Sequence, residues 1–140
     1  MFVLMMQGSP LTAKLPEDPG LGERFWYWCG ASGERYIHSI YRRELCPPVP
    51  GAVFVQVRSR GSSRYAANVG RLDSQGALSG LDSAALPGEE EEIHLHLLAR
   101  GDAGAECVLR DLMRAMNAPS RPALDVRPYS KPVQLDLLAA

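Results

Sequence analysis

Long apolar runs are absent from this chain of 140 residues, and cysteine is scarce. No segment approaches the roughly 20 consecutive apolar residues of a membrane-spanning helix, so no membrane association is expected. Three cysteines, an odd and sparse number, argue against a disulfide framework and favour reduced thiols in the cytoplasm. The apolar fraction of 46% and the charged fraction of 22% are typical of globular domains. This composition excludes a disordered chain, a collagen and a coiled coil.

Charge is nearly balanced overall but is distributed unevenly along the chain. The 15 basic and 16 acidic residues give a net charge of −1. Residues 24–71 carry eight arginines against two glutamates, whereas residues 72–106 carry one arginine against eight acidic residues. The planar guanidinium group of arginine suits both phosphates and carboxylates. These opposed blocks therefore suit either nucleic-acid binding or head-to-tail contact between copies of the chain.

Aromatic residues are interleaved with the arginines of the basic block. Rings that stack on bases, together with guanidinium groups that contact phosphates, are typical of nucleic-acid-binding proteins. The expected DNA or RNA contacts are Arg58, Arg60, Arg64 and Arg71. A simpler interpretation stays open, in which the arginines cover the solvent face of strands and the rings belong to the core.

Hydrophobic periodicity predicts an α+β fold, with a small antiparallel sheet, flanking helices and an additional N-terminal β-hairpin. The expected strands are residues 25–29, 35–41, 52–58, 64–69 and 93–98, and the expected helices are residues 74–86 and 103–116. The first two strands form one hairpin and the next two form another. The acidic run at residues 89–92 is expected to be a solvated loop.

The length indicates a single domain, which proline and glycine divide into four segments. The segments are an extended N-terminal arm (1–22), the β-hairpin (23–50), the core (51–117) and a proline-rich C-terminal extension (118–140). Within the extension, the alternating apolar residues of 133–137 predict a short edge strand.

Short motifs in the core occur in a characteristic order. Residues 51–54 (Gly-Ala-Val-Phe) open its first strand, and the second strand carries either residues 68–70 (Asn-Val-Gly) or residues 65–67 (Tyr-Ala-Ala). Glu106 lies in the first turn of the last expected helix, and Asn117 follows that helix. This order resembles the GIY-YIG nuclease domain, a three-stranded antiparallel sheet flanked by helices. The resemblance covers about half of the chain.

The resemblance implies metal-dependent cleavage of a phosphodiester. In that family a carboxylate holds the metal, an arginine serves the oxyanion, and tyrosines serve the nucleophile. Glu106 matches the metal ligand and would hold Mg²⁺ in an active enzyme, while Tyr65 and Arg71 are the candidates for the other roles. Phe54 replaces the first tyrosine, and its ring cannot transfer a proton. Residues 72–92 contain no basic residue to supply the arginine of the following helix.

Three functional hypotheses follow. The leading one is a non-catalytic GIY-YIG-like domain that binds nucleic acid and needs no cofactor. The second is a protein-interaction or homodimerisation module that uses the aromatic hairpin with Trp26 and Trp28. The third is a weakly active metal-dependent nuclease.

One histidine pair suggests a different kind of site. His94 and His96 alternate along a strand and point to the same face, so they could bind a metal ion with a third ligand such as Cys107 or His38. The competing interpretation places both histidines as polar residues on the less buried face of the strand.

Overall fold

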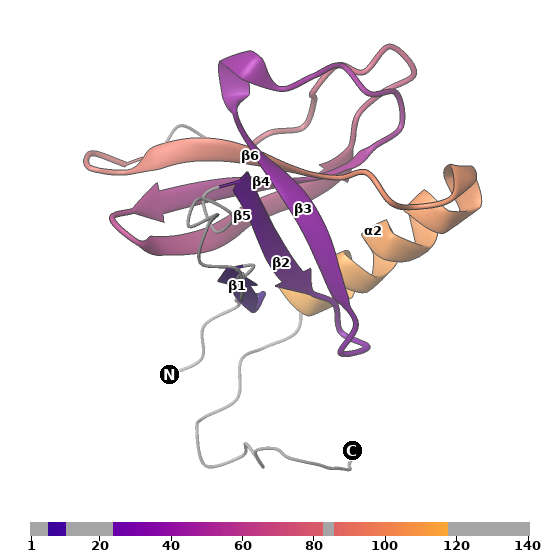
Figure 1. Ribbon diagram of the computed structural model, residues 1–140, viewed down its shortest axis with the longest axis horizontal. Helices are drawn as coiled ribbons and strands as arrows, with labels where there is room; N and C mark the ends of the chain where they lie inside the picture. Colours follow the sequence, from indigo (N-terminus) through magenta and orange to yellow (C-terminus); the bar gives the residue numbers. More distant parts are fainter. Residues whose placement is uncertain (1–5, 11–23, 83–85, 118–140) are drawn as a thin grey trace, which may run out of the picture.

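The computed structural model describes residues 6–10, 24–82 and 86–117. Its elements are, in chain order, β1 (Gly8–Pro10), β2 (Phe25–Cys29), β3 (Arg35–Arg42), the 3-10 helix η1 (Arg43–Leu45), β4 (Val53–Arg60), β5 (Ser63–Arg71), β6 (Glu90–His96) and α2 (Gly101–Asn117) (Figure 1). The α+β class, the five expected strands and the long expected helix are thereby confirmed, with shifts of a few residues at their ends. In the described part of the chain, no helix is long and apolar enough to cross a membrane.

The strands form one antiparallel sheet in the order β1-β2-β3-β6-β4-β5. Figure 1 shows β2 and β3 running at a steep angle to β4, β5 and β6, so that the sheet curls around α2. The two predicted hairpins, β2-β3 and β4-β5, are therefore not neighbours. The last strand, β6, lies between them and joins them into one sheet.

The sheet has a helix-facing side and a loop-facing side, both of which are covered by the protein. Along β4, Val53, Val55 and Val57 face α2, while Phe54 faces the loop that follows β5. The helix-facing core also contains Trp26, Trp28, Val69, Val108 and Leu112, and the loop-facing core contains Leu72, Ile93 and Leu95. Burial on both faces explains why β4 is a nearly continuous apolar run.

The expected helix over residues 74–86 does not form in residues 74–82, and the prediction of flanking helices is corrected to a single α-helix, α2, among the described residues. The side chain of Asp73 accepts hydrogen bonds from the backbone N–H groups of Gln75 and Ala77, both at 2.8 Å. Such local bonds give the backbone an alternative to a helix. Gly76 and Gly80 also adopt positive φ angles of 80° and 67°, which interrupt helical geometry. Residues 83–85 lie outside the described residues.

The N-terminal arm contributes a short edge strand, β1, that pairs with β2. Gly8 lies directly opposite Trp28, and a Cβ atom at Gly8 would come within 2.5 Å of the Trp28 ring. Glycine is therefore needed here for the ring to pack beneath the edge strand. Residues 1–5 and 11–22 of the arm, the C-terminal extension and the strand expected at residues 133–137 lie outside the described residues.

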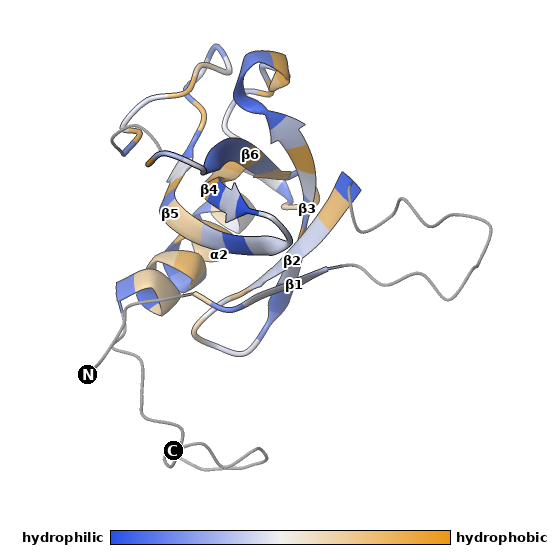
Figure 2. Cartoon of the chain, turned by 90° about the vertical axis from the view of Figure 1, so that its left-hand side faces the viewer, coloured by the Kyte–Doolittle hydropathy of each residue, from blue (hydrophilic) through white to orange (hydrophobic). Residues whose placement is uncertain are grey.

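Helix α2 is attached to the β2-β3 turn through Asp111. Its carboxylate accepts hydrogen bonds from the Ser32 backbone N–H at 2.9 Å and from the Tyr36 hydroxyl at 2.8 Å. Burial, together with the bond to this carboxylate, raises the pKa of Tyr36 to about 12. The apolar side of the helix is buried against the sheet, as Figure 2 shows. This attachment fixes the position of the polar residues on the rest of the helix.

Candidate functional site

Side-chain alternation separates the four arginines that the sequence assigns to nucleic-acid binding. Arg58 and Arg60 lie on the loop-facing side of the sheet, whereas Arg64 and Arg71 lie on the helix-facing side. Arg60 is exposed, and one of its nitrogens donates to the Pro87 carbonyl at 3.0 Å. Arg58 is buried, and its Nε and Nη2 atoms lack hydrogen-bond partners among the described residues. The four arginines do not form one continuous surface.

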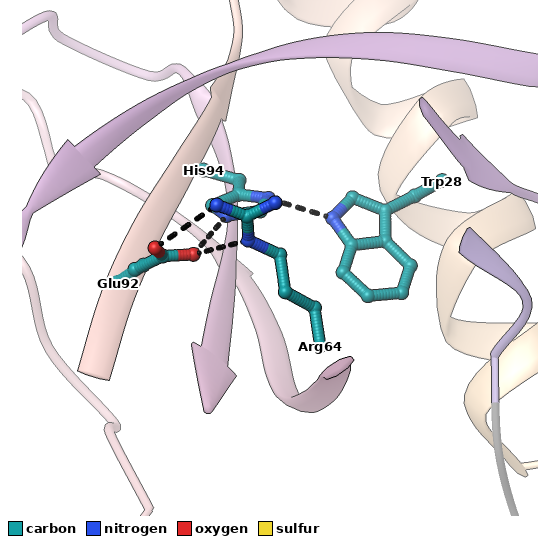
Figure 3. A network of polar contacts seen from close by, with 4 residues as sticks. All are labelled: Trp28, Arg64, Glu92 and His94. Atoms are coloured by element: carbon teal, nitrogen blue, oxygen red, sulfur yellow. Dashed lines mark hydrogen bonds and ion pairs between the residues drawn. The ribbon is translucent and has the colours of Figure 1, made fainter. Parts of the chain in front are cut away.

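Arg64 belongs to a largely buried polar network (Figure 3). Its guanidinium group binds both carboxylate oxygens of Glu92, at 2.8 and 3.3 Å, and lies over the Trp26 ring at 4.8 Å from the centroid. The same carboxylate contacts Nε2 of His94 at 3.0 Å, and Nδ1 of His94 accepts a hydrogen bond from Trp28 at 3.0 Å. The network therefore connects β5, β6 and β2 across the curled sheet.

These contacts fix the protonation state of the network. The Trp28 N–H can only donate, so Nδ1 of His94 is the unprotonated nitrogen and Nε2 donates to Glu92. Burial lowers the pKa of His94 and keeps the ring neutral. Burial alone would raise the pKa of Glu92, but the hydrogen bonds from His94 and Arg64 outweigh it and lower that pKa to about 2. Glu92 is therefore ionised and Arg64 balances its charge.

The other two histidines adopt the opposite tautomer. Nδ1 of His38 donates to the Tyr36 carbonyl at 2.8 Å, and Nδ1 of His96 donates to the Ile37 carbonyl at 2.7 Å. The two rings lie 5.3 Å apart, centroid to centroid. Burial lowers the pKa of His38 to about 3. His94 and His96 are thus both buried, and the prediction of a less buried strand face is wrong, because the curled sheet and α2 enclose that face.

In the part of the chain that the structure describes, no group of three or more His, Cys, Asp or Glu side chains is arranged to hold a metal ion. Cys107, one of the proposed third ligands, is exposed on α2.

Arg71 and Glu106, two of the three candidate catalytic residues, are brought together. Nη1 of Arg71 lies 3.0 Å from a Glu106 oxygen, Nη2 lies 2.7 Å from an Asp102 oxygen, and Nε donates to the Gly51 carbonyl at 2.8 Å. Arg71 thus connects the end of β5 to α2 and to the turn before β4. The Glu106 carboxylate that would hold Mg²⁺ is already paired with a guanidinium group, so these residues do not suit the metal.

Tyr65, the third candidate, lies at the other end of β5. Six residues of strand separate it from Arg71, a distance of about 20 Å. Its hydroxyl donates to Glu89, and this bond raises the pKa of Tyr65. The register therefore does not place Tyr65 beside Glu106.

The two motif positions on β4 and β5 have a packing role. Phe54 is fully buried and lies opposite Gly70 in the β4-β5 pair. A Cβ atom at Gly70 would come within 2.9 Å of the Phe54 ring. Gly70 therefore makes room for that ring, and neither residue offers a group that could take part in proton transfer.

A cleft of about 200 Å³ opens beside Arg71, between the turn at Gly51, the end of β6 and the start of α2. Its lining includes Arg71, Asp102 and His96, together with Val53, Ala99 and Ala105. A second hollow of about 460 Å³ adjoins it and shares Gly51, Arg71 and Asp102. Arg71 and Asp102 thus line both of these concave surfaces.

A groove of about 480 Å³ runs along the exposed side of α2. It is lined by Glu106, Leu109, Arg110, Met113, Arg114 and Asn117. Arg110 and Arg114 are exposed and one helical turn apart. These two arginines are not among the predicted nucleic-acid contacts, because they lie outside the basic block; their four-residue spacing on one expected helix is the signal in the sequence that points to them.

Part of the opposite charge of the two blocks is paired within the molecule, by three arginines and four carboxylates. The ion pairs Arg43–Glu91, Arg64–Glu92, Arg71–Asp102 and Arg71–Glu106 each join the basic block to the acidic block. Trp26 and Trp28 are likewise buried in the helix-facing core. The rings of Trp26 and Trp28 therefore do not form an exposed partner surface in this structure.

Comparison of the chain with models of protein families, with curated proteins and with solved structures gave no match.

Proposed function

We propose that the chain is a GIY-YIG-like domain that binds nucleic acid without cleaving it. The observation that carries the proposal is that Arg71 binds both the Glu106 carboxylate and the Gly51 carbonyl. These residues come from three separate segments that the resemblance assigns to one site. The order of β4, β5, β6 and α2 along the chain is also the order of the motifs, apart from the helix expected after β5, which does not form in residues 74–82.

Binding without cleavage is inferred from the ion pairs of Arg71 and Glu106. Arg71 contacts two carboxylates, so its charge is compensated before any phosphate arrives. Glu106 is held by that arginine, and the tyrosine needed for the nucleophile lies at the far end of β5. Each missing electrostatic or proton-transfer role costs a nuclease about a hundred- to a thousand-fold in rate.

The groove along α2 is the surface best suited to the phosphate backbone. Arg110 and Arg114 place two guanidinium groups along one side of the helix, and Leu109 and Met113 provide apolar contact for sugars or bases. Asn117 adds a hydrogen-bonding group at the end of the groove. Glu106 lies at the opposite end of the groove from Asn117 and binds Arg71, which lines the cleft. The groove therefore leads from the exposed arginines toward the cleft.

We predict measurable binding of a fluorescent single-stranded oligonucleotide at 50 mM salt, with a dissociation constant in the range of about 10⁻⁴ to 10⁻⁶ M. The double variant Arg110→Ala/Arg114→Ala should weaken binding about tenfold or more, because it removes two phosphate contacts. Fluorescence anisotropy measures both constants. Arg60→Ala is the matched control, since Arg60 is exposed on the loop-facing side. If Arg60→Ala raised the dissociation constant more than the double variant does, the interface would lie on the β4-β5 hairpin instead.

We also predict no nicking of supercoiled plasmid in the presence of Mg²⁺ or Mn²⁺. The assay compares the parent protein with Glu106→Ala, which removes the one carboxylate that matches the metal ligand of the family. Nicking by the parent that disappears in Glu106→Ala would show a weakly active nuclease and would contradict the non-catalytic assignment.

A further inference from the structure

We infer that the cleft beside Arg71 receives a single unpaired base that carries an exocyclic amino group. The inference rests on the proposed function and adds to it the class of nucleic acid and of base. The cleft, of about 200 Å³, is smaller than the roughly 300–1,000 Å³ typical of drug-sized sites, so it suits one small ring system. Bases become available for such a pocket only when they are unstacked, which favours a single strand over a duplex.

The position of the cleft suits a base whose backbone follows the groove on α2. Asp102 lines the cleft and Glu106 lines the groove. These residues are one helical turn apart, and both bind Arg71. A strand whose phosphates contact Arg110 and Arg114 would therefore reach the mouth of the cleft at Asp102.

The polar groups of the cleft favour hydrogen-bond donors over acceptors. His96 lines the cleft and donates its Nδ1 proton to the Ile37 carbonyl, so its Nε2 atom carries a lone pair that can accept a hydrogen bond. Asp102 uses one carboxylate oxygen for Arg71, and its side chain is 93% exposed, which leaves the other oxygen accessible. Both groups accept hydrogen bonds, and an exocyclic amino group can donate two.

The same chemistry disfavours a phosphate inside the cleft. Two carboxylates surround the Arg71 guanidinium group, and three of its nitrogen atoms already donate hydrogen bonds. A further anion would meet more negative than positive charge. A neutral ring avoids that repulsion, and the apolar side chains of Val53, Ala99 and Ala105 provide contact for its faces.

Cytosine and thymine test whether the cleft selects a hydrogen-bond donor. The two bases have similar size, but cytosine has a donor at position 4 and thymine has an acceptor there. Cytosine presents an amino group that carboxylates accept from, whereas thymine presents a carbonyl oxygen. Thymine in the cleft would bring an acceptor toward the acceptors of His96 and Asp102. The structure therefore predicts selection against thymine rather than a general preference for pyrimidines.

The test compares oligo-dC with oligo-dT of 12 nucleotides by fluorescence anisotropy at pH 8 and 50 mM salt. The parent protein should bind oligo-dC about tenfold more tightly. Asp102→Asn should reduce that ratio to within about twofold, whereas Asp82→Asn, which alters an exposed carboxylate outside the cleft, should retain it. Ala99→Leu, which narrows the cleft, should also reduce the ratio.

The outcomes separate the two proposals. Equal binding of oligo-dC and oligo-dT by the parent, or a preference for oligo-dT, would overturn the base pocket while nucleic-acid binding stands. A dC preference that survives both Asp102→Asn and Ala99→Leu would place recognition elsewhere and would also overturn it. Failure to bind either oligonucleotide would overturn the proposed function and the inference together.

Discussion

Acidification below pH 6.5 is expected to unfold the domain, and His38 is expected to be a main cause. The side chain is 1% exposed, and burial lowers its pKa from 6.5 to about 3. The unfolded chain takes up this proton near pH 6.5, whereas the folded chain takes it up only near pH 3. Between these values the unfolded state binds more protons, so the free energy of unfolding falls as pH falls.

The expected size of the effect is large compared with the stability of a small domain. One proton contributes up to about 1.4 kcal/mol per pH unit, and the unfolded chain is only half protonated at pH 6.5, so His38 alone lowers the free energy of unfolding by about 2 kcal/mol between pH 6.5 and pH 4.5. The lowered pKa of His94 acts with the same sign. Below pH 4.5 the lowered pKa of Glu92 adds to the loss, because protonation removes a carboxylate that the folded state stabilises.

Urea denaturation at pH 7.5 and at pH 5 gives the free energy of unfolding at each pH and so tests this prediction. His38→Asn is the informative variant, because its amide nitrogen can still donate to the Tyr36 carbonyl but does not titrate. Its midpoint should change less between the two pH values than that of the parent. Equal changes for the parent and His38→Asn would contradict the assignment of the acid sensitivity to this buried ring.

Loss of the Glu92 carboxylate is expected to destabilise the fold by about 2–4 kcal/mol. Glu92→Ala leaves the Arg64 guanidinium group above Trp26 without its carboxylate and the His94 N–H without an acceptor. The side chains of Arg64 and Glu92 are each 18% exposed, so the cost lies somewhat below that of a fully buried pair. Chemical denaturation at pH 7.5 gives the difference directly.

The adjacent residue on β6 provides a matched control for this network. Glu91 pairs with Arg43, whose side chain is 54% exposed, so Glu91→Ala should cost less than about 1 kcal/mol. A double-mutant cycle of Glu92→Ala with Arg64→Met should also show a strong coupling energy. Equal costs of Glu92→Ala and Glu91→Ala would contradict the view that the network in Figure 3 holds the sheet together.

Periodicity predicted the strands and the long helix, since side-chain alternation follows directly from burial. It placed the start of β6 three residues late, because the acidic run at residues 89–92 was interpreted as a loop. In the structure the strand begins at Glu90, where Arg43 of η1 and Arg64 of β5 compensate two of these carboxylates. Compensation by residues distant in sequence is not visible in a local pattern.

The same limit applies to the candidate site. The resemblance made Glu106 the candidate metal ligand and left Arg71 as a substitute for the arginine of the following helix; the fold places these two residues in contact. It did not reveal that Asp102 also binds Arg71 or that His96 lines the adjacent cleft. Those relations depend on how α2 packs across the end of the sheet, which follows from the tertiary attachment through Asp111 rather than from any motif.

The salt dependence of oligonucleotide binding tests the central claim most directly. If the backbone contacts Arg110 and Arg114, the logarithm of the association constant for a single strand should fall with the logarithm of salt concentration with a slope of about −1.4. That slope corresponds to about sevenfold weaker binding at 200 mM than at 50 mM salt. The slope should approach zero in Arg110→Ala/Arg114→Ala; an unchanged slope in that variant, or no binding by the parent at 50 mM salt, would contradict the account.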